Sequence, residues 1–210
     1  MPEWGTLGLF LLAALALVVT PGPSVLYIVT RSIDQGRGAG VASALGIEAG
    51  TLVHVVAAVI GISALVASSA AAFAVVKYLG AAYLISMGVR SLISRPEPET
   101  LVVRAPRSRL RIFWQGIAVQ VLNPKTALFV LAFLPQFVDP GRGSVITQTV
   151  IFGVLMAVIG LFSDLVYAMI AGAAGGFLRR STVFPRVQRY VSGGVYLGLG
   201  ATTALMGSRD

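Results

Sequence analysis

Two proline-containing motifs interrupt long apolar segments of the sequence at positions where a substrate could bind. The motifs are Thr20-Pro21-Gly22-Pro23 and Asn123-Pro124-Lys125. Because proline has no N–H, the carbonyl groups of Leu17, Val19 and Gln120 lose their usual helical partners. The start of a helix attracts a carboxylate, and a freed carbonyl group accepts a hydrogen bond from an ammonium group. The motifs therefore predict a site for a molecule that carries both charges, or two kinks that serve packing alone.

Four ionisable side chains lie within apolar segments rather than in the connectors between them. They are Glu48, His54, Lys125 and Asp164. Burying a charge within a membrane is costly, so such residues are functional candidates by default. We predict that Asp164 and Glu48 accept a proton or an ammonium group, with a permanent ion pair or hydrogen bond as the structural alternative. A lone histidine is more often a packing residue than a ligand, so His54 and its neighbour Thr51 are secondary candidates.

Small residues surround two of these candidates with helical spacing. Glycine or alanine shares a helical face with Asp164 at positions 153, 157, 160, 168 and 172. In the segment that carries Glu48, Gly46, Gly50 and His54 recur every fourth residue. Small side chains let two helices approach closely, so both faces predict either internal packing or the seam of a homodimer.

The composition places these residues in a membrane. Hydrophobic residues make up 56% of the chain and charged residues only 11%, and six segments reach the length of about 20 apolar residues that a spanning helix needs. The six spans are expected at residues 7–29, 41–66, 70–94, 113–135, 146–171 and 187–206. We therefore expect an all-α integral membrane protein in which residues 1–210 form a single transmembrane domain.

The arginines set the expected orientation of the spans. If the N-terminus lies outside, twelve arginines fall on the inner side, and only Arg142 and Arg209 fall on the outer side. Basic connectors stay on the cytoplasmic side. Residues 95–111, which are rich in arginine and proline, are therefore predicted to form a cytoplasmic loop, and both termini are predicted to lie outside.

The chain divides into two halves with corresponding features, about residues 1–94 and 112–210. Pro21 in the first expected span corresponds to Pro124 in the fourth, and the Gly-Ala-Ala-Tyr-Leu run that contains Tyr83 corresponds to the Gly-Gly-Val-Tyr-Leu run that contains Tyr196. Three spans in each half give the halves opposite directions, which is the inverted-repeat plan of many secondary transporters. Tyr83 and Tyr196 are expected either to line the cavity or to pack in the core.

The composition also argues against several other classes of protein. The chain has no cysteine and a single histidine, so no thiol chemistry, metal site or cofactor is expected, and an enzyme active site would have few groups to use. The net charge of +8 comes from basic residues that flank apolar segments, which does not indicate a nucleic-acid partner. The expected partners are membrane lipid and a small molecule.

Five motifs follow one another in a fixed order along the chain. They are Thr20-Pro21-Gly22-Pro23, Gly36-Arg37-Gly38-Ala39-Gly40, Lys77-Tyr78-Leu79-Gly80-Ala81-Ala82-Tyr83-Leu84, Asn123-Pro124-Lys125 and Phe133-Leu134-Pro135-Gln136-Phe137. Together they resemble the LysE/RhtB family of bacterial amino-acid exporters, and the resemblance covers the whole chain. It implies export of amino acids or close derivatives across the inner membrane, driven by the proton gradient.

The resemblance also implies which residues take part in transport. It assigns substrate binding to the motifs at residues 20–23 and 123–125, and a functional role to Asp164. We expect alternating access, in which the substrate carboxylate lies near the first motif or Lys125 and its ammonium group near Asp164 or Glu48. Export of another small metabolite, or a membrane protein without transport activity, remains the alternative.

Overall fold

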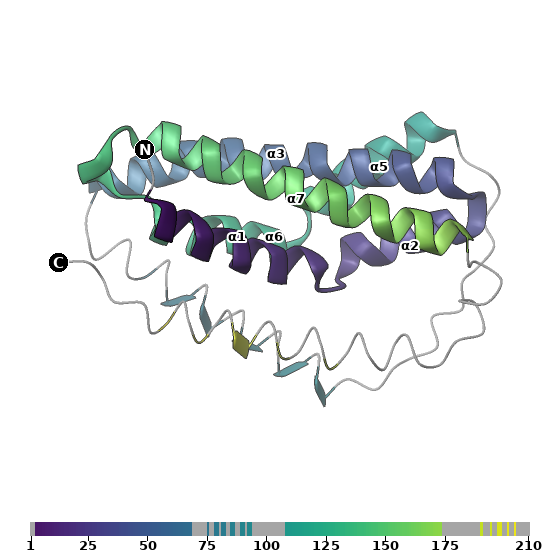
Figure 1. Ribbon diagram of the computed structural model, residues 1–210, viewed down its shortest axis with the longest axis horizontal. Coiled ribbons are helices and arrows are strands. Elements are labelled where there is room, and N and C mark those ends of the chain that lie inside the picture. Colours follow the sequence, from purple (N-terminus) through teal and green to yellow (C-terminus); the bar gives the residue numbers. More distant parts are fainter. Residues whose placement is uncertain are drawn as a thin grey trace.

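The computed structural model describes residues 3–68 and 108–173, together with scattered positions between 75 and 93 and between 190 and 204. All regular elements of these residues are helices. The long helices lie side by side along one direction (Figure 1). The expectation of an all-α protein is therefore confirmed for this part of the chain.

The first expected span, residues 7–29, is a pair of helices. α1 (Trp4–Val19) ends at Thr20, α2 (Pro23–Gln35) begins after Gly22, and the two are bent by 49°. Pro21 cannot supply the N–H that would continue α1. Pro23 begins α2, a position where the N–H has no helical partner in any case. The predicted break is confirmed.

The fourth expected span, residues 113–135, is broken in the same way. α5 (Arg109–Val121) is followed by α6 (Pro124–Leu128), the π-helix η1 (Phe129–Phe133) and the 3₁₀-helix η2 (Leu134–Phe137). The bend at this break is also 49°. The Asn123 side chain accepts a hydrogen bond from the Lys125 N–H at 3.1 Å, which caps the new helix and fixes its starting point.

Two helices are continuous, α3 (Arg37–Ser68) and α7 (Val145–Ala173). Residues Arg37–Gly61 of α3 and all of α7 are long and apolar enough to cross a membrane, and each bent pair passes as one further candidate. The described residues thus contain two clear membrane spans, or up to four if each bent pair forms one span. Most of the expected spans at 70–94 and 187–206 and of the loop at 95–111 lies outside the described residues. The number of six spans, the inverted repeat and the side of the termini therefore remain predictions.

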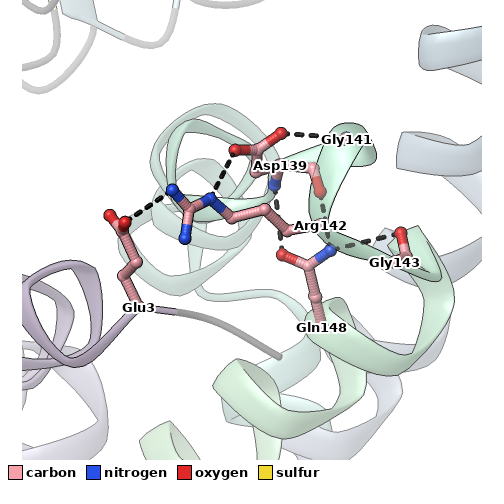
Figure 2. A network of polar contacts seen from close by, with 6 residues as sticks. All are labelled: Glu3, Asp139, Gly141, Arg142, Gly143 and Gln148. Carbon is pink, nitrogen blue, oxygen red and sulfur yellow. Dashed lines mark hydrogen bonds and ion pairs between the residues drawn. The ribbon is translucent and has the colours of Figure 1, made fainter.

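A polar network joins the start of α1 to the loop before α7 (Figure 2). Arg142, in the 3₁₀-helix η3 (Pro140–Arg142), forms ion pairs with Glu3 at 2.5 Å and with Asp139 at 3.2 Å. The buried Gln148 side chain accepts a hydrogen bond from the Asp139 N–H and donates one to the Asp139 carbonyl. Following the predicted orientation, we call this end of the molecule the outer end. The opposite end, where Arg109 lies against α3, is the inner end.

An aromatic cluster fills the outer half of the molecule. The rings of Phe10 in α1 and Phe152 in α7 have centroids 4.6 Å apart, and Phe137 in η2 contacts both. Phe129 and Phe133 in η1 extend the cluster. We call these five residues the outer aromatic cluster. It lies between the two breaks and the outer end.

Glycines place α3 directly against α5 and α7. A Cβ atom at Gly46 would overlap the carbonyl oxygen of Phe113, and one at Gly50 would lie 2.6 Å from a side chain of α5. On α7, a Cβ atom at Gly153 would lie 2.5 Å from a methyl carbon of Val55. Small residues permit such close helix contacts. Internal helix packing therefore accounts for these glycines, so they no longer support a homodimer.

Replacement of Gly46 by alanine is expected to destabilise the protein, because the added methyl group has no space against α5. Overpacking of this kind costs about 1–3 kcal/mol, so the midpoint of thermal unfolding in detergent should fall by several degrees. Gly61→Ala on the same helix is the matched control, since a Cβ atom there meets nothing within 4 Å. Equal unfolding midpoints for the two variants would contradict the close contact between α3 and α5.

Candidate functional site

A small, partly open cavity lies between the two breaks. Its volume is about 30 Å³, enough for about two water molecules. Its polar lining comes from five helices and from the second break, and consists of Ser24, Glu48, Thr51, Gln120, Asn123, Lys125, Thr126 and Asp164. The fold thus brings together residues that are as far apart in the sequence as Ser24 and Asp164.

Lys125 connects the two breaks directly. Its ammonium group donates a hydrogen bond to the carbonyl of Thr20, with an N–O distance of 2.6 Å, and the side chain is buried. The Thr20 hydroxyl in turn donates to the carbonyl of Ala16. Because Asn123 caps the Lys125 N–H, the position of the ammonium group depends on the geometry of both motifs.

Two of the carbonyl groups freed by proline find partners on other helices. The Tyr167 hydroxyl donates to the Val19 carbonyl at 2.7 Å. His54 Nε2 donates to the Gln120 carbonyl at 2.9 Å, which requires the ring proton to be on Nε2. His54 therefore supports the second break. Tyr167 was not predicted, although its spacing of three residues from Asp164 gives it the same helical face.

Glu48 and Asp164 form a carboxyl pair in the cavity. Their exposed fractions are 9% and 3%, and both carboxyl groups line the same cavity. Lys125 is the neighbouring cation of Asp164. The buried Glu48 Oε2 atom has no hydrogen-bond partner in the described part of the chain. Gly160 makes space for the pair, because a Cβ atom there would overlap the Glu48 carboxyl group.

A chain of neutral polar groups occupies the side of the cavity formed by α2, α3 and α5. Gln120 donates to the Thr51 hydroxyl at 2.7 Å and accepts from the Ser24 hydroxyl at 2.5 Å. Asn123 donates to the Ser24 oxygen at 2.8 Å. The predicted residues Thr51 and Asn123 are thus joined by two residues that were not predicted. The only feature of the sequence that indicated a role for Ser24 and Gln120 was a polar side chain close to a break.

The other predicted residues lie as follows. Pro21 and Gly22 are buried at the first break, whereas the prolines that begin α2 and α6 are exposed. Tyr83 and Tyr196 lie outside the described residues. Across the described ranges, no group of three or more histidine, cysteine or acidic side chains could hold a metal ion.

The chain is similar to known bacterial proteins over most of its length. The family model described as LysE type translocator matches residues 15–207. The chain belongs to this family. A homoserine/homoserine lactone efflux protein of Salmonella typhimurium is 31% identical over 81% of this chain and 82% of its own. No solved structure matches the chain.

Further LysE relatives place the chain in a membrane. An uncharacterized membrane protein of Vibrio cholerae is 27% identical over 93% of this chain and 94% of its own. The membrane protein YrhP of Bacillus subtilis is 28% identical over 91% of this chain and 95% of its own. With the apolar helices of the fold, these matches make the protein a multi-pass translocator of the bacterial inner membrane.

Proposed function

We propose that the protein is a secondary active exporter that moves amino acids or close derivatives out of the cytoplasm in exchange for protons. The observation that carries the proposal is the convergence of both helix breaks, Lys125 and the carboxyl pair on one small cavity. The relatives named homoserine/homoserine lactone efflux protein support both the direction of transport and the class of substrate.

The charges around the cavity suit an amino-acid zwitterion. The first turn of α2 begins beside Gly22, which lines the cavity, and the start of a helix favours an anion. Together with the Lys125 ammonium group, it forms the proposed site for the substrate carboxylate. The carboxyl pair of Glu48 and Asp164 is the proposed site for the substrate ammonium group.

The carboxyl pair is also the proposed site of proton coupling. Two carboxylates that line one small cavity repel each other, so we propose that the pair shares one proton when no substrate is bound. Binding of the substrate ammonium group on the inner side displaces this proton. Binding of a proton on the outer side then displaces the ammonium group, which exchanges one proton for one substrate molecule.

The size of the cavity supports alternating access. A volume of about 30 Å³ holds water but not an amino acid, so the cavity must open to bind substrate. We propose that the two halves rock about the breaks. The outer aromatic cluster and the ion pair of Glu3 with Arg142 keep the outer side closed in the present conformation.

The proposed architecture has six spans in two inverted halves, residues 1–94 and 112–210, with both termini outside. The equal bend of 49° in each of the two pairs supports it. The chain passes the two breaks in opposite directions, as an inverted repeat requires.

Uptake into inside-out membrane vesicles tests the transport activity. Vesicles that contain the protein should accumulate at least one labelled amino acid from a panel of basic, neutral and hydroxylated members, and vesicles without it should not. Uptake restricted to other small metabolites would replace the substrate class. A complete lack of uptake by protein shown to be folded and inserted would contradict the proposed function.

A further inference from the structure

Arg31 of α2 is a buried cation outside the cavity. Its exposed fraction is only 7%, and it lies seven residues inward from Ser24 on the same helix, a distance of about 10 Å at 1.5 Å per residue. The tendency of basic residues to stay on the cytoplasmic side accounts for exposed arginines in connectors. It does not account for an arginine enclosed between helices.

Among the described residues, the contacts of Arg31 use little of its hydrogen-bonding capacity and include no acidic counter-charge. Its guanidinium donates to the neutral Gln115 side chain at 3.3 Å and lies 5.4 Å from the centre of the Tyr27 ring. In the described part of the chain Arg31 forms no ion pair. A guanidinium has five N–H donors in a planar fork that fits a carboxylate, and a buried charge without a counter-charge is unfavourable.

The neighbours of Arg31 continue the polar lining of the cavity toward the inner end. Along the contact between α2 and α5, Ser24 pairs with Gln120 at the cavity, the Tyr27 hydroxyl donates to the backbone of α5 at 2.8 Å, and Arg31 meets Gln115. We call this row the α2–α5 polar seam. It places polar side chains at three points along the contact between α2 and α5.

We propose that Arg31 is a substrate-binding residue at the inner entrance, where its guanidinium binds the carboxylate of a substrate before the substrate reaches the cavity. This inference rests on the proposed function. It adds a first binding step to that function, and it makes the α2–α5 polar seam the entry path. The carboxylate is the anion that all free amino acids share, so the step selects amino acids from neutral metabolites.

The test measures KM and kcat for uptake of a transported amino acid into inside-out vesicles. Arg31→Gln is expected to raise KM by about 10- to 100-fold, the size of one lost charge-assisted hydrogen-bonded pair, with little change in kcat. Arg31→Lys, which keeps the charge, should give an intermediate KM. Arg111→Gln is the matched control, because Arg111 is an exposed arginine at the inner end, and its KM should equal that of the wild type.

A second readout separates substrate binding from a structural role. The free amino acid and its methyl ester, which lacks the carboxylate, are compared as inhibitors of uptake. The wild type should be inhibited more strongly by the free acid, and this preference should be clearly smaller in Arg31→Gln, where only the carboxylate site in the cavity remains. A KM that is unchanged in Arg31→Gln, or a loss of inhibition that is equal for acid and ester, would overturn the assignment.

Lipid phosphate offers the same anionic chemistry from another source, and vesicle composition distinguishes the two. The effect of Arg31→Gln should be the same in purely zwitterionic vesicles and in vesicles that contain phosphatidylglycerol. An effect that disappears without the anionic lipid would assign the guanidinium to lipid and overturn the proposal. If the wild type takes up no amino acid at all, the proposed function itself fails; if uptake is normal and Arg31 is without effect, only this inference fails.

Discussion

Replacement of Asp164 by asparagine is expected to abolish efflux driven by a proton gradient while leaving the protein folded and inserted. Asparagine has nearly the same shape as aspartate, so the packing around Gly160 should be kept. It cannot bind a proton or carry a negative charge, so the exchange of a proton for the substrate ammonium group has no site. The measurement is gradient-driven efflux from proteoliposomes, which should fall to the level of liposomes without protein.

Two further variants serve as comparisons for the Asp164→Asn result. Asp34→Asn, in α2 and outside the cavity lining, is the matched control and should retain the wild-type rate. Glu48→Gln should also lose gradient-driven efflux, because it removes the other member of the carboxyl pair. Full coupled efflux by Asp164→Asn would show that the proton binds elsewhere.

Joining the two halves at the outer end is the second change with a large expected effect. The chain has no native cysteine, so the pair Glu3→Cys and Arg142→Cys places the only two thiols at the ends of an ion pair. These positions lie in the first and second half of the chain. A short reducible thiol cross-linker between them should hold the outer side closed, stop transport almost completely, and allow full recovery after reduction.

The control for the cross-link lies within one half. Asp139→Cys combined with Thr147→Cys joins the outer loop to the start of α7, and the same reagent should leave the transport rate unchanged there. Each single-cysteine variant should also keep its activity after treatment. Normal transport by the cross-linked Glu3–Arg142 pair would mean that the two halves do not separate at this end, contrary to alternating access.

The breaks and the contact faces were predictable because their causes are local. A proline without an N–H ends a helix whatever surrounds it, which is why the sequence indicated the breaks at Pro21 and Pro124. Likewise, glycines at helical spacing indicated that α3 packs closely against another helix through Gly46 and Gly50. The rarity of acids within apolar segments pointed to Glu48 and Asp164.

The partners of these residues were not predictable, because each depends on which helix lies opposite. Hydropathy marks a segment as membrane-spanning, but it does not say which neighbour a given face meets. The hydrogen bond from His54 to the Gln120 carbonyl joins α3 to α5 across 66 positions of sequence. In the sequence, Ser24 and Gln120 are isolated polar residues. Only the contact between α2 and α5 brings them together.

Direct detection of proton movement during efflux tests the central claim, that one cavity exchanges substrate for protons. Proteoliposomes are loaded with the transported amino acid and a pH-sensitive dye, and efflux is started without an imposed gradient. The account predicts that substrate leaving the vesicles brings protons in, so that the interior becomes acidic in proportion to efflux. It predicts no such change for Asp164→Asn. Wild-type efflux at a constant internal pH would contradict it.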